Sequence, residues 1–209
     1  LKNFKKKNYY TYYKEKKDLN LTNQSKVFDY LRKIKPDAVV LAAAKVGGIN
    51  ANNTDRARFI YENISIQTNV IHGSYLAGVK NLIFLGSSCV YPKNSRQPIK
   101  EEYLLSNYLE KTNEPYAVAK IAGLKLCENY SSQYNLNYKT LMPCNSYGEN
   151  DNYDSINSHF LPALIKKIIE AIRKNNKYIT LWGNGKSLRE LIFSEDVALA
   201  CSFFLKKKT

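Results

Sequence analysis

Short apolar runs alternate with longer helical patterns along the first two thirds of the sequence. The apolar runs cover residues 37–44, 81–86 and 138–142, and the helical patterns cover about 24–34, 54–78 and 114–134. The first two runs, without polar residues at every second position, are typical of strands buried on both faces of a parallel sheet. Helices between such strands indicate an α/β fold, a doubly wound parallel sheet of the Rossmann type.

The last third is more irregular. Residues 143–157 have the Asn-, Ser- and Asp-rich composition of a loop, and a helix is expected from near Ser158 to about Lys174. Short strands are expected at 178–182 and 189–193, and Ser194 is expected to cap a last helix. We therefore divide the chain into a dinucleotide-binding domain, 1–157, and a partial substrate-binding region, 158–209, some of whose segments return to the first sheet.

Residues 113–120, Asn-Glu-Pro-Tyr-Ala-Val-Ala-Lys, begin the third helical pattern. Asn113 is a suitable cap, and Pro115 is tolerated in a first helical turn. Tyr116 and Lys120 are four residues apart and share one helix face. An adjacent ammonium favours the phenolate, so we expect the pKa of Tyr116 to lie below its usual ~10. Taken alone, this spacing more often reflects an unrelated surface pair in a chain with 17 Tyr.

A second reactive segment, 86–92, follows the apolar run 81–86. Ligands of open parallel sheets bind beyond the carboxyl ends of the strands. Ser87 could hydrogen-bond a substrate carbonyl there while Tyr116 approaches from the other side, which polarises a ketone for hydride transfer. Cys89 lies two residues further on. His159 begins a predicted helix, although a lone His is more often structural or solvated.

Charge and cysteine usage limit the function classes. The net charge is +14, but Lys is spread among Asn and Tyr in every loop and no nucleic-acid-binding motif accompanies it, so we expect no nucleic-acid partner. The four Cys have no metal-site spacing, which favours reduced thiols, a cytoplasmic location and no metal. No apolar run reaches about 18 residues, so we expect no membrane partner.

Four stretches together resemble one enzyme family. They are Ala-Ala-Ala-Lys-Val-Gly-Gly at 42–48, Gly-Ser-Ser-Cys-Val-Tyr-Pro at 86–92, the segment 113–120 and Trp-Gly-Asn-Gly at 182–185. In this register they resemble the GDP-L-fucose synthases, epimerase–reductases of the extended short-chain dehydrogenase/reductase superfamily. The resemblance covers residues 18 to about 205. The Tyr-x-x-x-Lys pattern is weak alone, whereas the combination is specific.

The resemblance implies a substrate, a cofactor and roles for the site residues. The family inverts C3 and C5 of GDP-4-keto-6-deoxy-D-mannose before NADPH reduces C4. By resemblance, Ser87 and Tyr116 would bind the keto oxygen, Lys120 would hold the nicotinamide ribose, Cys89 would be the base and His159 the acid. The resemblance also implies which residues contact each ligand. Those implied to contact NADP(H) are Leu85, Gly86, Ser87, Ser88, Tyr116, Lys120, Pro143, Cys144, Asn145, Ser146 and His159. Those implied to contact the GDP-sugar are Lys167, Trp182 and Arg189. The family also implies a homodimer that pairs through helices 54–78 and 114–134.

The sequence departs from the family pattern at several points. Lys167 stands where the family shows Arg, which keeps the charge but loses the bidentate fork. Cys144 and Ser146 alter the Pro-x-Asn loop. No glycine-rich segment of the GxxGxxG type occurs, and the first residue is Leu1 rather than Met.

From these departures we expect a fragment that opens at about the second strand of the 3-2-1-4-5-6 order and binds NADP poorly. Strands 2–3 and 4–5–6 would then share no neighbour and leave two open edges. Two alternative functions stay open: another nucleotide-sugar epimerase or dehydratase, of which Cys89 disfavours the dehydratase, and a non-catalytic remnant.

Overall fold

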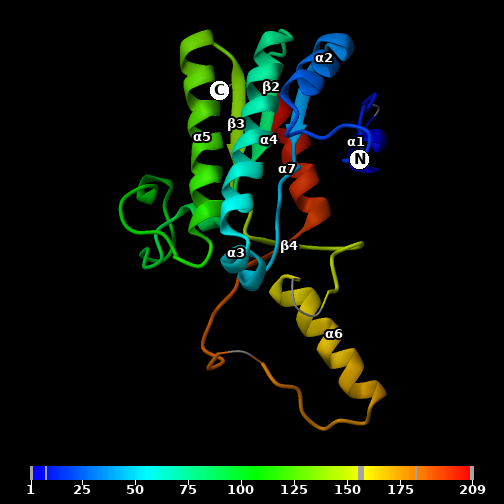
Figure 1. Ribbon diagram of the computed structural model, residues 1–209, viewed down its shortest axis with the longest axis vertical. Coiled ribbons are helices and arrows are strands. Elements are labelled where there is room, and N and C mark those ends of the chain that lie inside the picture. Colours follow the sequence, from blue (N-terminus) through cyan, green and yellow to red (C-terminus); the bar gives the residue numbers. More distant parts are fainter. Residues whose placement is uncertain (1, 8, 155–157, 182, 208–209) are drawn as a thin grey trace.

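A three-stranded parallel sheet forms the centre of the molecule (Figure 1). The computed structural model describes residues 2–7, 9–154, 158–181 and 183–207. The sheet has the order β1 (Ala38–Leu41), β2 (Asn81–Leu85) and β3 (Asn137–Leu141). The central strand β2 is the most buried, because it has a neighbour on each side and helices on both faces. These strands confirm the three apolar runs of the sequence within a few residues.

One face of the sheet is covered by α4 (Arg56–Leu76) and α5 (Glu114–Tyr134), with α2 (Gln24–Ile34) packed against α4 (Figure 1). Leu82, Phe84 and Tyr138 point to this side and join the larger core cluster. A Cβ added at Gly123 would lie 2.6 Å from Phe84 Cζ, so only glycine lets α5 approach β2 this closely.

The opposite face is covered by α7 (Ser194–Lys206), against which α1 (Lys2–Lys6) packs. Ile83 of β2 forms a second core cluster with Val197 and Cys201 of α7. Helices on both faces of a parallel sheet confirm a doubly wound, Rossmann-like α/β fold. The predicted capping role of Ser194 is wrong: Phe193 occupies the N-cap position, and no side chain there accepts a capping bond.

The strand order corrects the expected gap in the sheet. β1 pairs directly with β2, and β2 pairs directly with β3, with Val39 opposite Leu82 and Ile83 opposite Lys139. Among the described residues no strand precedes β1, and β1, β2 and β3 are hydrogen-bonded to one another in chain order. The prediction of two groups without a shared neighbour is therefore wrong for these residues, since the three strands are consecutive neighbours.

The remaining segments differ more from the sequence-based expectations. The predicted helix 54–78 is interrupted at Asp55, giving α3 (Ile49–Thr54) before α4. The predicted loop 143–157 contains β4 (Asn145–Tyr147), which pairs in parallel with β5 (Leu191–Phe193). The predicted strand 178–182 is absent over 178–181, the part of it that the structure describes. The helix predicted near Ser158 is α6 (Phe160–Arg173), which extends away from the sheet (Figure 1).

Candidate active site

The loops that leave β2 and β3 lie side by side at the carboxyl edge of the sheet. The Gly86 amide donates to the Leu141 carbonyl at 2.8 Å, and the Ser88 amide donates to the Pro143 carbonyl at 3.3 Å. The parallel pairing of the two strands thus continues past their ends. This contact brings together the two segments in which the sequence predicts cofactor contacts, 85–88 and 143–146.

Ser87 links this edge to the helix that follows. Its hydroxyl accepts a hydrogen bond from the Cys89 amide at 3.3 Å, and it also hydrogen-bonds the phenol of Tyr116. Cys89 lies in the short 3₁₀ helix Ser88–Val90, close enough to the phenol to influence its pKa. A hydroxyl, a phenol and a thiol therefore surround one position beyond the carboxyl end of β2, as the sequence predicts.

The start of α5 places Tyr116 over that position. Pro115 occupies the first helical turn, as predicted, and is buried. Asn113 is the N-cap residue but makes no capping bond through its side chain, and its buried Oδ1 atom has no described partner. The expectation that the Asn113 side chain caps the helix is wrong: its described bonds there are backbone ones, from its amide to the Glu110 carbonyl at 3.2 Å and from the Ala117 amide to its carbonyl at 3.0 Å.

Lys120, one turn after Tyr116, is buried, with 4% of its surface exposed. Its ammonium donates to the Leu85 carbonyl at 2.7 Å and lies 4.6 Å from the centre of the Phe84 ring. Burial disfavours the charged form and lowers the pKa of Lys120 to about 8. The ammonium lies 5.7 Å from the centre of the Tyr116 ring, so both groups face the same region.

The direction of the Tyr116 pKa shift is opposite to the predicted one. Burial raises the pKa of the phenol above its ordinary value, the neighbouring Cys89 raises it further, and the hydrogen bond with Ser87 opposes the increase. The proximity of Lys120 does not outweigh burial, because its ammonium is directed to the Leu85 carbonyl. Tyr116 is therefore protonated at neutral pH, and its O–H is available as a proton donor.

A buried amide network, which the sequence reasoning missed, holds the loop after β1. Asn63 of α4 accepts a hydrogen bond from the Lys45 amide at 2.9 Å and donates to the Lys45 carbonyl at 3.0 Å. Asn52 donates to the carbonyls of Gly47 and Gly48 at 2.8 and 3.1 Å. Asn63 falls on the buried stripe of the predicted helix, together with Phe59, and a polar residue on such a stripe was the available signal.

The residues predicted to bind the sugar nucleotide lie apart from this group. His159 is an exposed N-cap residue of α6, and no described hydrogen bond or ion pair joins its side chain to Ser87. Lys167 of α6 donates to the Thr180 carbonyl at 2.9 Å, and Arg189 is exposed. Trp182 lies outside the described residues. The structure thus brings together the sheet-edge candidates but not those of the last third.

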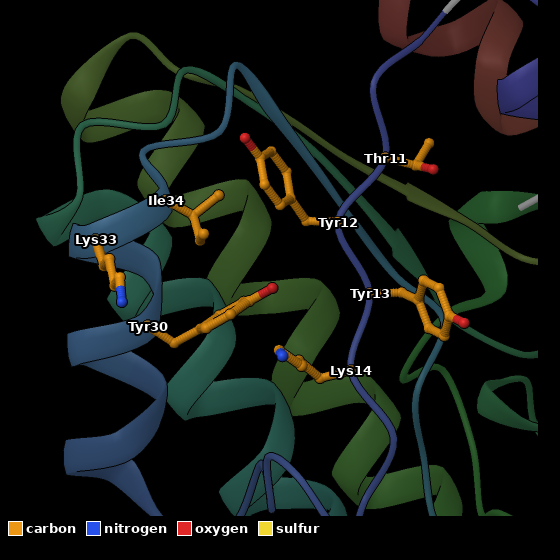
Figure 2. A pocket seen from close by; sticks show the side chains of 7 residues that line it. All are labelled: Thr11, Tyr12, Tyr13, Lys14, Tyr30, Lys33 and Ile34. Carbon is orange, nitrogen blue, oxygen red and sulfur yellow. The ribbon is translucent and has the colours of Figure 1, made fainter.

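A described hollow lies elsewhere, away from these residues. A space of about 400 Å³ lies between the N-terminal segment and α2, where Tyr12 and Lys14 extend toward Tyr30 (Figure 2). None of its lining residues is a predicted site residue. No described helix is long and apolar enough to cross a membrane, and the described residues contain no cluster of three or more His, Cys, Asp or Glu able to hold a metal ion.

A Rossmann-like sheet with Ser, Tyr and Lys gathered at its carboxyl edge defines an extended short-chain dehydrogenase/reductase. The model of the NAD dependent epimerase/dehydratase family matches residues 2–209, and the chain belongs to this family.

Individual relatives agree with this assignment. The chain is 51% identical over 192 residues to a GDP-L-fucose synthase of Sinorhizobium fredii, covering 92% of this chain and 61% of that protein. A GDP-D-glycero-L-gluco-heptose synthase from Campylobacter jejuni, solved in the presence of NADPH, is similar with a TM-score of 0.86 and 37% identity, over 97% of this chain and 68% of that one. A GDP-L-fucose synthetase from Naegleria fowleri bound to NADP has a TM-score of 0.85 and 27% identity, over 99% and 68%. The chain thus spans about 61% of the length of its curated relative.

Proposed function

We propose that the protein to which these residues belong is an NADPH-dependent epimerase–reductase that converts GDP-4-keto-6-deoxy-D-mannose to GDP-L-fucose. The observation that carries this proposal is the hydrogen bond between Ser87 and Tyr116, with Cys89 beside them at the carboxyl edge of the sheet. A ketone held there would meet two O–H donors and a thiol. Similarity to GDP-L-fucose synthases supports the choice of substrate.

The residues present fit the nicotinamide half of NADP(H). An ammonium has three N–H donors, and the buried one of Lys120 has the Leu85 carbonyl as its described acceptor, so it suits ribose hydroxyls. The backbone at 85–88 and 143–146 would hold the nicotinamide end. The bound cofactor supplies a hydride for C4 of the sugar. The 209 residues contain no glycine-rich turn to hold its pyrophosphate.

The epimerisation half of the reaction depends on acidic C–H bonds. Hydrogen bonds from Ser87 and Tyr116 to the C4 ketone polarise it, which acidifies the protons on C3 and C5. Cys89 then takes a proton from one face, and His159 returns one to the other face. For this step α6, which begins directly after His159, has to lie over the sheet edge.

The reduction half uses Tyr116 as the acid. As charge develops on the C4 oxygen, the phenol transfers its proton to that oxygen, and Ser87 keeps its hydrogen bond. The raised pKa of Tyr116 keeps this proton on the phenol before the reaction. Lys120, whose pKa is lowered to about 8, holds the ribose beside the phenol and can return a proton to it.

The remaining expectations form part of the same proposal. Residues 158–209 contribute to a substrate region in which Lys167, Trp182 and Arg189 hold the GDP moiety, Arg189 through its fork to the diphosphate. Two copies pair through α4 and α5, whose exposed apolar residues Tyr61 and Val118 support this choice. Four free thiols support a reducing, cytoplasmic location.

The decisive experiment separates epimerisation from cofactor binding. In a preparation that turns over the GDP-keto sugar, Cys89→Ser is expected to abolish solvent-deuterium uptake at C3 and C5, measured by NMR. NADPH binding, measured by nicotinamide fluorescence, is expected to stay within twofold of the parent. Unchanged deuterium uptake would remove Cys89 as the base.

A second candidate is another 4-keto GDP-sugar epimerase–reductase. The similarity to a GDP-heptose synthase supports this alternative. Such an enzyme would carry out the same steps at C3, C4 and C5, and its substrate would differ only in the group at C6. A comparison of kcat/KM for 6-deoxy and heptose forms of the GDP-keto sugar distinguishes the two, since the true substrate class is expected to react at least ten times faster.

A further inference from the structure

Two helices of the chain begin after an asparagine, and their first turns are held in different ways. At α2 the Asn23 side chain accepts a hydrogen bond from the Lys26 amide at 3.1 Å, which caps the helix. At α5 the Asn113 side chain makes no capping bond. Tyr116 lies in the first turn of α5, the part of a helix that frays when its end groups have no partners. The phenol therefore needs support from outside its own helix.

An arginine of the neighbouring helix contacts this turn. Arg56 is the first residue of α4, which packs alongside α5 (Figure 1). Its Nη1 atom donates to the Lys111 carbonyl at 2.7 Å, and its Nη2 atom lies 3.5 Å from Oε2 of Glu114. Lys111 comes two residues before Asn113, and Glu114 is the first residue of α5. The guanidinium thus holds the chain on both sides of the uncapped position.

The two contacts of Arg56 differ in strength. The side chains of Arg56 and Glu114 are 41% and 49% exposed, and an ion pair in such a setting contributes little by itself. The bond to the Lys111 carbonyl is short and has a charged donor, which makes it the stronger contact. The support of the turn therefore depends mainly on an N–H donor directed at that carbonyl.

The α4 end of this contact is itself fixed to the protein. Asp55, the residue before Arg56, forms an ion pair with Lys45 of the loop after β1, with Nζ and Oδ2 3.1 Å apart. Phe59, three residues after Arg56, is buried in the core. The start of α4 is thus packed well enough to hold another segment in place.

We propose that Arg56 is a positioning residue, which fixes the first turn of α5 and so keeps the Tyr116 phenol in its hydrogen bond with Ser87. This role rests on the proposed function, in which the phenol protonates the keto oxygen. The described polar contacts of Arg56 are with Lys111 and Glu114, so its effect reaches the phenol through the helix backbone. A displaced proton donor loses interaction with the transition state, which lowers kcat more than it changes KM.

Amide hydrogen exchange tests the contact without requiring activity. The Asn113 amide bonds to the Glu110 carbonyl, and the Ala117 amide bonds to the Asn113 carbonyl. Arg56→Met removes the guanidinium but keeps a long side chain, so we expect both amides to exchange at least fivefold faster, measured by NMR. The Val27 amide makes the corresponding first-turn bond in α2, and its exchange rate is expected to stay unchanged.

Kinetics with the GDP-keto sugar test the effect on the phenol. In a preparation that turns over this substrate, Arg56→Met is expected to lower kcat for NADPH oxidation five- to twentyfold and to leave KM within twofold. In the Tyr116→Phe background the phenolic proton is absent, so the same change is expected to alter kcat by less than twofold. A general structural defect would instead lower kcat by the same factor in both backgrounds.

Three further variants locate the effect. Arg58→Met is the matched control, because Arg58 lies on the same helix and its described ion pairs are with carboxylates close to it in the sequence. Its exchange rates and kcat are expected to stay within twofold of the parent. Arg56→Lys can still donate to the Lys111 carbonyl, so we expect its kcat within threefold of the parent. Glu114→Gln removes only the weaker, charged contact, and its kcat is expected to stay within twofold.

The possible failures are distinguishable. In Arg56→Met, unchanged exchange at Asn113 and Ala117, an unchanged kcat, or equal losses in both backgrounds would each overturn the positioning role. The same losses in Arg58→Met, or a kcat for Arg56→Lys as low as that of Arg56→Met, would also overturn it. If exchange accelerates but the parent does not turn over the GDP-keto sugar, the support of α5 by Arg56 stands and the proposed function fails. If the parent is active and Arg56→Met is equally active, only this inference fails.

Discussion

The candidate residues fall into two regions that differ in how they are held. At the sheet edge, Lys120 is buried and bonded to the Leu85 carbonyl, and Tyr116 is bonded to Ser87. In the outlying region, His159 and Arg189 are exposed, and α6 extends away from the sheet. The first region is fixed by packing against a parallel sheet, whereas the second is fixed by few contacts. Catalytic geometry is therefore preorganised only where the sheet core supports it.

The largest expected effect comes from breaking the preorganised region at its proton donor. Tyr116→Phe removes the O–H that protonates the keto oxygen, so reduction is expected to slow by about 10²- to 10⁴-fold. NADPH oxidation with the GDP-keto sugar measures this rate. Tyr108→Phe is the matched control, because Tyr108 is 90% exposed. A Tyr116→Phe rate within threefold of the parent would show that another group supplies the proton.

The next effect concerns the amide network that supports the loop after β1. Asn63→Ala leaves the Lys45 amide and the Lys45 carbonyl without their described side-chain partner, and removes a second donor to the Phe59 carbonyl. We expect a loss of about 3 kcal/mol in the free energy of unfolding, measured in urea. Asn129→Ala is the control, because that exposed amide bonds only its own helix and should cost under about 0.5 kcal/mol. Equal losses in both variants would contradict the supporting role of Asn63.

Lys120 gives a pH-dependent effect of intermediate size. Its pKa is about 8 in the folded chain and 10.5 as the ordinary value. Between these values the unfolded state binds more protons, so stability rises with pH and is lost as pH falls toward 8. From pH 7.5 to 9.5 the parent is expected to gain about 2 kcal/mol relative to Lys120→Met. Urea unfolding at both pH values checks this, and parallel pH profiles of the two proteins would contradict it.

The two regions also differ in how well the sequence predicts them. The bounds of α2 were predictable because helical periodicity reports the buried face, and the three sheet strands were predictable within a few residues because continuous apolar runs indicate burial. The convergence of Ser87, Cys89 and Tyr116 was predictable because the end of a strand and the start of a helix fix their positions. The sign of the Tyr116 pKa shift was not, since burial depends on neighbours that are distant in sequence. Likewise β4 was not predicted, because its residues lie in a segment of loop-like composition and form a strand only by pairing with β5, a predicted strand that is distant in sequence.

The smallest expected effect is in the outlying region, where a substitution tests whether α6 contacts a phosphate of the GDP-sugar. Lys167 donates to the Thr180 carbonyl at 2.9 Å. Lys167→Arg could keep that bond and present a second N–H to a phosphate oxygen, so we expect a two- to fivefold lower KM for the GDP-sugar and an unchanged kcat. This corresponds to about 0.4–1 kcal/mol of binding free energy.

The control for that change is its neighbour on the same helix. Lys166→Arg adds the same guanidinium one residue away and should leave KM unchanged. If both variants lower KM equally, the gain is general attraction of an anion by positive charge, and α6 would hold no defined phosphate contact. If Lys167→Arg instead lowers kcat, α6 positions the sugar during the reaction. The outlying region would then be preorganised for catalysis, as the sheet edge is.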